Sequence, residues 1–124
     1  MQGNKREAVN LVEKLKFFEG LFSHRIVGEV NDMYVKLVKA DGEFIWHTHE
    51  WEDELFYVIK GHLRMLFRDR EVDVAPGEFI VVPHGIEHKP TFTEETHLML
   101  IEPKATVNTG DAEENELTHE PEWI

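Results

Sequence analysis

The sequence predicts an all-β fold of the sandwich or barrel type. From Arg25 onward, the chain divides into about nine short runs that are rich in Val, Ile, Phe and Tyr. Turn residues such as Asp41-Gly42 and Pro76-Gly77 separate these runs. Short strands at this spacing are typical of antiparallel sandwiches and barrels. The length of 124 residues suits one domain, which we expect to span residues 1–124.

The N-terminal segment differs from the rest because its apolar residues follow a helical spacing. One stripe contains Ala8, Leu11, Val12, Leu15 and Phe18. Asn4 followed by Glu7 weakly resembles a capping box, and Gly20 is a plausible end. The pattern predicts a short helix within residues 4–22.

The strand-like runs predict a barrel core over about residues 25–102. Each run is short and bounded by turn residues. The expected strands are Arg25–Val30, Tyr34–Ala40, Glu43–His49, Glu54–Ile59, His62–Phe67, Glu71–Val74, Phe79–Val82, His88–Thr93 and His97–Ile101.

The remaining segment, residues 103–124, is an acidic C-terminal tail. Between Asp111 and Glu122 it is rich in carboxylates and lacks the period-two pattern of a strand. One interpretation is a solvated tail. The other is docking through Trp123-Ile124, either on its own barrel or on a partner subunit, because a free tail gains nothing from a large apolar end.

Composition excludes several classes of function. The net charge of −12 disfavours nucleic acid and anionic membranes as partners. The absence of cysteine excludes disulfides and thiolate chemistry. Ser23 is the only serine, and it lacks the glycines of a nucleophile elbow. With neither a signal peptide nor a membrane span visible, we expect a soluble cytoplasmic protein.

Three histidines and a glutamate form the candidate metal site. His47 and His49 are two residues apart in a strand-like run, so both rings point to the same face. Glu54 begins the next run, which could return antiparallel beside the first, and His88 begins a later one. This mixed nitrogen and oxygen set suits Fe, Mn, Ni, Cu or Zn rather than Ca or Mg.

The other histidines have simpler interpretations. We expect His24, His62, His97 and His119 to be surface or hydrogen-bonded residues, and His84 to be a turn residue. The acidic run 50–54 would ordinarily be a solvated loop. On their own, His47 and His49 leave metal ligation an open question.

The spacing of glycines and prolines around these residues resembles the two motifs of the cupin superfamily. The first reads His47-Thr-His49, four residues, Glu54, six residues, Gly61. The second reads Gly77, five residues, Pro83-His-Gly85, two residues, His88. Over about residues 30–102 the chain is therefore similar to a small single-domain cupin. Gly42 lies one residue closer to His47 than is usual in the family, and Phe92 replaces the usual Asn.

The resemblance implies a double-stranded β-helix, also called a jelly roll, with a metal in its wider mouth. It carries the ligand positions onto His47, His49, Glu54 and His88. It also implies a homodimer.

Strand parity extends the site toward an apolar pocket. The residues expected nearest the mouth are Ile45, Phe56, Met65 and Phe92, which could line a pocket above the metal. Apart from the ligands no clear acid or base is visible, so Glu54 is the candidate catalytic residue. Tyr34, Tyr57 and His97 are further candidates if they face inward.

Three functional hypotheses remain open at this point. The first is a metal-dependent enzyme acting on a small molecule, such as an oxygenase, isomerase or lyase. The second is a non-catalytic barrel that binds or senses a small ligand. The third is a structural barrel whose metal only rigidifies the mouth.

Overall fold

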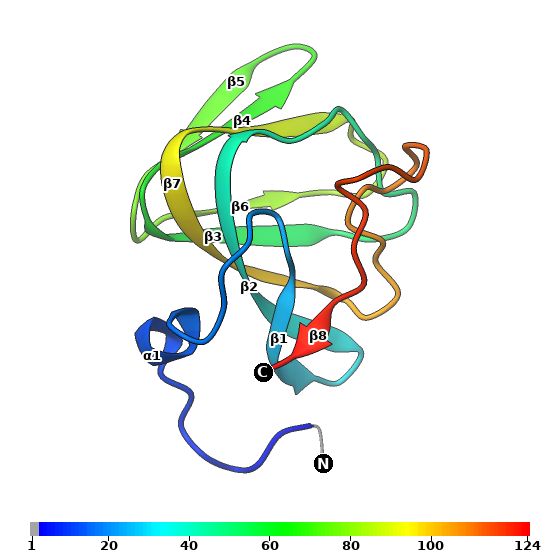
Figure 1. The fold of residues 1–124 in the computed structure, drawn as a ribbon. Coiled ribbons are helices and arrows are strands. Elements are labelled where there is room, and N and C mark those ends of the chain that lie inside the picture. The colour runs from blue at the N-terminus through cyan, green and yellow to red at the C-terminus, as the bar shows by residue number, and fades with distance from the viewer. Residues whose placement is uncertain (1–2) are drawn as a thin grey trace.

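Strands dominate the computed structural model, which describes residues 3–124. Eight strands of the described chain form one sheet that folds over on itself (Figure 1). The strands are β1 (Arg25–Val30), β2 (Met33–Glu43), β3 (Glu54–Lys60), β4 (Leu63–Phe67), β5 (Glu71–Val74), β6 (Phe79–Val82), β7 (His88–Pro103) and β8 (Glu122–Trp123).

The long strands β2 and β7 connect the two layers of the fold. The first part of β7 pairs with β4, its last part pairs with β3, and both parts pair with β2. Both strands curve from one layer into the other at one end of the molecule (Figure 1). The sheet does not close into a complete ring, since β6 pairs only with β3. The predicted all-β fold of jelly-roll type is confirmed.

Two of the predicted strand boundaries are wrong. Residues 88–93 and 97–101 belong to the single strand β7. The segment 43–49 is not a continuous strand, because it bonds to β7 only intermittently. The backbone N–H of Phe44 donates to Pro90, and His47 and His88 form an isolated bridge with two bonds of 3.0 Å.

The short N-terminal helix is present, but it begins later than the Asn4–Glu7 pattern suggests. Helix α1 (Leu11–Leu15) is capped by Asn10, whose side chain accepts a hydrogen bond from the N–H of Glu13. Asn4 instead anchors the segment before the helix through two hydrogen bonds to the backbone of Glu29.

Two hydrophobic clusters hold these elements together. One fills the barrel and consists of Val38, Ala40, Phe56, Val58, Leu63, Met65, Val74, Val82, Phe92, Leu98 and Leu100. The other lies outside the sheet, where Leu15 and Phe18 pack against Val27 and Leu37.

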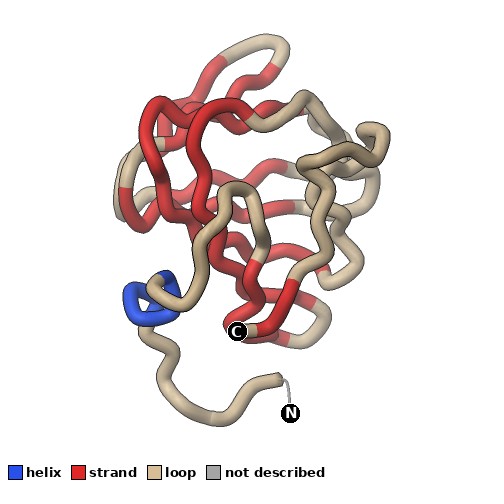
Figure 2. Tube along the Cα trace, in the orientation of Figure 1, coloured by secondary structure: helices blue, strands red, loops and turns tan. Residues whose placement is uncertain are grey.

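The C-terminal tail docks on its own barrel. Strand β8 pairs in parallel with β1, and Ile124 packs against the outer cluster. Between β7 and β8, the tail runs across the end of the barrel where the long loops gather (Figure 2). These contacts of Trp123 and Ile124 correspond to docking on the protein's own barrel. No helix within residues 3–124 is long and apolar enough to cross a membrane.

Candidate metal centre

The four predicted ligands lie together inside the barrel. His47 pairs with His88 at the start of β7, and Glu54 is the first residue of β3. All four side chains are buried. Each residue offers one potential ligand atom, and these four atoms all lie within 4.8 Å of one another. The parity argument for His47 and His49 therefore gave the correct geometry even though their segment is not a regular strand.

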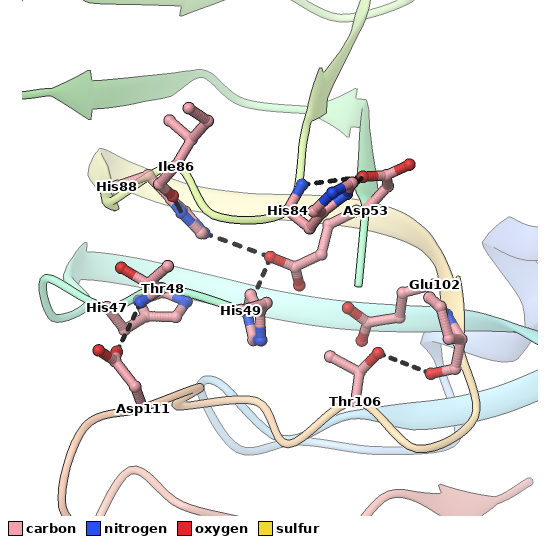
Figure 3. Close-up of polar contacts among 12 residues, drawn as sticks. His47, Thr48, His49, Asp53, His84, Ile86, His88, Glu102, Thr106 and Asp111 are labelled. Atoms are coloured by element: carbon pink, nitrogen blue, oxygen red, sulfur yellow. Dashed lines mark hydrogen bonds and ion pairs between the residues drawn. The ribbon is translucent and has the colours of Figure 1, made fainter. Parts of the chain in front are cut away.

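The carboxylate of Glu54 lies between two of the imidazoles. Its Oε1 is 2.9 Å from Nε2 of His49 and 3.2 Å from Nε2 of His88. His49 and His88 both turn toward this carboxylate (Figure 3). One cation could therefore contact nitrogen and oxygen donors at the same time.

Backbone carbonyls fix the orientation of two of the rings. Nδ1 of His47 donates to the carbonyl of Ile45 at 2.8 Å, and Nδ1 of His88 donates to that of Ile86 at 2.9 Å. With the proton on Nδ1, Nε2 of each ring carries the lone pair that a metal needs.

His49 provides the test of whether a metal fits here. Both of its ring nitrogens are buried and lack a hydrogen-bond partner among residues 3–124. The 2.9 Å approach to Glu54 has the distance of an ion pair but not the angles of a hydrogen bond. A buried polar atom without a partner is costly, and metal ligation would satisfy one of these two nitrogens.

The electrostatics favour the protonation states that metal binding requires. Burial, with His88 as the next cause, lowers the pKa of His47 to about 4, so its ring is neutral at pH 7. Burial alone would raise the pKa of Glu54. Contacts with Glu102, His49 and His88 outweigh it and hold the pKa well below its usual value. Neutral imidazoles and an ionised carboxylate are the metal-binding forms.

The loops around the site are joined to one another. The N–H of Gly85 donates to the carbonyl of His49 at 2.8 Å, and the N–H of His84 donates to Asp53 at 2.8 Å. From the tail, Asp111 accepts from the N–H of Thr48 at 2.7 Å (Figure 3). The ligand-bearing loop is thus held by the second motif on one side and by the tail on the other.

A small cavity of about 30 Å³ adjoins the ligands. It is lined by Phe22, His24, Val38, Ala40, Phe44, His47, Glu54, Phe56, Pro90, Phe92, Leu98, Leu100 and Asn108. Two of the predicted pocket residues, Phe56 and Phe92, are in this lining. Ile45 is half-buried and Met65 belongs to the core, and neither borders the cavity. Tyr34, Tyr57 and His97 do not border it either.

Sequence reasoning missed a second buried polar cluster, formed by His24, Lys36 and Glu102. Of the two alternatives predicted for His24, surface or hydrogen-bonded, the second is confirmed, since the ring is buried and Nδ1 contacts Nζ of Lys36. The sequence does contain a pattern that predicts this cluster. Lys36 shares its strand face with Val38, and Glu102 shares its face with Leu100, so period-two parity points both charged residues inward.

Comparisons with known proteins agree with this fold and site. Residues 33–104 match the model of the Cupin_2 family, described as a cupin domain. A cupin-2 domain protein from Shewanella frigidimarina is 44% identical, with a TM-score of 0.75 over 77% of this chain and 93% of that one. Protein NMB1881 from Neisseria meningitidis is 28% identical, with a TM-score of 0.72 over 78% and 99% of the two chains.

A curated relative in Bacillus subtilis is also similar. It is the uncharacterized protein YdbB, which is 39% identical over 64 residues, or 51% of this chain. The match spans 57% of that protein's length. Because the family model covers more than half of the sequence, the chain belongs to the cupin family.

Proposed function

We propose that the protein binds a divalent transition metal through His47, His49, Glu54 and His88, and uses it to hold a small organic molecule. The observation that carries this proposal is His49, whose buried ring nitrogens have no hydrogen-bond partner in the described chain. The mixed donor set suits Fe, Mn, Ni, Zn or Cu.

We infer the chemical class of the bound molecule from the residues that line the cavity. A metal held by these four residues would supply Lewis acidity to an oxygen of the ligand. Phe44, Phe56 and Phe92 supply apolar walls that exclude water from the same space. Glu54 is the proposed catalytic residue, because its carboxylate borders the cavity next to the other ligands. The reaction that we propose is of the oxygenase, isomerase or lyase type.

A second candidate function is non-catalytic binding or sensing of a small ligand. It is favoured by the lining, in which His24, His47 and Glu54 are the only titratable side chains. Turnover separates the two candidates. We would screen small oxo-acids, diphenols and sugars against the metal-loaded protein. An enzyme consumes one of them, whereas a sensor is stabilised against heat by one of them without forming product.

Metal analysis of the purified protein tests the metal site itself. We expect uptake of one divalent ion per chain and loss of that uptake in the variant His47→Ala/His49→Ala. The matched control is His62→Ala/His97→Ala, which removes two histidines that lie outside the cavity and pair with Asp73 and Glu95. Equal uptake by both double variants, or no uptake by the wild type at pH 7–8, would overturn the proposal.

The homodimer and the cytoplasmic location expected from the sequence stay predictions. Sedimentation of the purified protein tests the first, since a dimer has twice the mass of 14.6 kDa.

A further inference from the structure

The second polar cluster, consisting of His24, Lys36 and Glu102, is as deeply buried as the metal site. The exposed fractions are 7% for His24, 1% for Lys36 and 0% for Glu102. Charged side chains are almost never buried to this extent unless they are paired. The three residues come from the loop before β1, from β2 and from β7.

The register of β2 and β7 brings this cluster together. Lys36 pairs with Leu100, so Glu102 is its diagonal neighbour on the same face. Nζ of Lys36 donates to Oε1 of Glu102 at 2.8 Å and lies 3.5 Å from Nδ1 of His24. Lys36 and Glu102 are therefore hydrogen-bonded partners, and His24 lies at the end of this pair. Burial, with Glu54 as the next cause, raises the pKa of Glu102 well above its usual value.

Lys36 also decides which nitrogen of His24 carries the proton. An ammonium group can only donate, so Nδ1 of His24 is an acceptor toward Lys36 and the ring proton is on Nε2. Burial, with Lys36 as the next cause, lowers the pKa of His24 to about 3, so the ring is neutral at pH 7.

His24 also borders the cavity beside the metal site. The lining of that cavity includes both His24 and the metal-site residues His47 and Glu54. Nε2 of His24 has no hydrogen-bond partner within residues 3–124, whereas Nδ1 is in contact with Lys36. The ring therefore has an N–H group without a hydrogen-bond partner among residues 3–124, and the residue borders a mainly apolar cavity.

We infer that His24 is a ligand-positioning residue, whose Nε2–H donates a hydrogen bond to a second oxygen of the molecule held at the metal centre. The inference rests on the proposed function and extends it to a substrate class. That class is a small, mainly apolar molecule with two separated oxygen acceptors. One oxygen lies at the metal ligands and the other, a neutral carbonyl, accepts from His24.

The charges of the cluster favour a carbonyl over a second anion at His24. Lys36 is already paired with Glu102, and the ring of His24 is uncharged. A neutral donor offers a carbonyl an ordinary hydrogen bond but does not compensate the desolvation of a second carboxylate or a phosphate. The cavity of about 30 Å³ is small, so a five-carbon acid enters only when the apolar lining moves apart.

A pair of matched acids tests the inference by calorimetry on the full-length protein loaded with Zn²⁺. The probes are 4-oxopentanoate and pentanoate, which share a chain and a carboxylate and differ in the keto oxygen. We expect the wild type to bind 4-oxopentanoate about threefold to tenfold more tightly, as one added hydrogen bond implies. His24→Phe should abolish this preference, and His24→Gln, which keeps an N–H donor, should retain part of it.

The controls separate this inference from the function on which it rests. Zn²⁺ affinity should be the same in all three proteins, and the preference is read in each protein as the ratio of its affinities for the two acids. A wild type that binds no Zn²⁺ would overturn the proposed function and the inference with it. Normal Zn²⁺ binding with equal affinities for the two acids, with binding of neither, or with a preference that survives in His24→Phe would overturn the inference alone.

The ring proton of His24 provides a readout that needs no ligand. Nitrogen-15 NMR of the metal-free wild type should show His24 as a neutral ring protonated at Nε2. A ring protonated at Nδ1 would contradict the inference, because Nε2 would then have no hydrogen to donate.

Discussion

The barrel contains two neighbouring polar clusters that solve the problem of buried charge differently. In the metal-ligand cluster, the groups that act most strongly on the carboxyl group of Glu54 are Glu102, His49 and His88. In the other cluster, Glu102 is paired with the ammonium of Lys36 at 2.8 Å. The Glu54 cluster therefore has no cation of its own, whereas the Glu102 cluster has the ammonium of Lys36. The two carboxyl groups are also in contact, and this contact lowers the pKa of Glu54, while burial and the same contact raise the pKa of Glu102 well above its usual value.

The largest effect on stability should come from removing the buried ammonium group of Lys36. Lys36→Met removes the ammonium that donates to Oε1 of Glu102 at 2.8 Å and leaves a buried acceptor without its partner, which should lower the free energy of unfolding by about 3 kcal/mol. Urea unfolding measures the loss. The control Lys60→Met, at an exposed position at the end of β3, should change stability by less than about 0.5 kcal/mol.

The double variant Lys36→Met/Glu102→Leu sharpens this prediction. Removing both charges leaves no unpaired ion, and such replacements are often close to neutral. Most of the stability lost in Lys36→Met should therefore return. An equal loss in the single and double variants would show that packing, and not charge, governs the cluster.

The next largest effect on stability should come from adding a metal ion that binds to the metal-ligand cluster. Zn²⁺ at 100 times its dissociation constant should raise the free energy of unfolding of the wild type by about 2.7 kcal/mol. It should leave His47→Ala/His49→Ala unchanged, because that variant lacks two of the four donors. Thermal or urea unfolding with and without Zn²⁺ measures the difference. Stabilisation of equal size in the double variant would place the ion elsewhere.

The two clusters also differ in how far the sequence could predict them. His47, His49, Glu54 and His88 are each at a fixed spacing from a turn glycine or proline, so local patterns located them. Their positions depend on turns and on the alternation of side chains along a strand. This alternation still places His47 and His49 on one face, although residues 43–49 form only an isolated bridge.

The charged cluster has no such local pattern. Lys36 and Glu102 are 66 residues apart, and their pairing follows only from the register between β2 and β7. Parity alone points them inward, but a lone charged residue is ordinarily expected at the surface. In the same way, the sequence pattern predicts Asn4 as the helix cap, whereas the cap is Asn10 and the side chain of Asn4 is bonded to the backbone of Glu29, a contact across 25 residues that no local pattern shows.

A smaller effect should follow from disturbing the tail that holds the metal-ligand loop. A Cβ on Gly110 would crowd the carbonyl oxygen of Thr48 and lie 3.1 Å from the ring of His47. Gly110→Ala should therefore cost about 2 kcal/mol in stability, as overpacking does. Gly77→Ala is the matched control, since Gly77 also has positive φ but nothing lies within 4 Å of its Cβ. Equal losses would mean that backbone strain alone is responsible.

The smallest effect concerns the response of the charged cluster to acid. The unfolded chain binds a proton on His24 near pH 6.5, whereas the folded protein does so only near pH 3. Between these values the unfolded state holds more protons, so stability falls as the pH falls. The groups that face His24 are Lys36, Glu102, Glu54, His49 and His119.

Comparing the wild type with His24→Phe isolates this contribution. Between pH 6.5 and pH 5, the metal-free wild type should lose about 1–2 kcal/mol more stability than the variant, at no more than about 1.4 kcal/mol per pH unit. Urea unfolding at each pH measures both slopes. His47 titrates in the same direction, with a pKa of about 4, but it is present in both proteins and cancels in the difference. Parallel slopes would mean that His24 takes up its proton as easily in the folded protein as in the unfolded chain, and the charged cluster would then not hold its ring neutral.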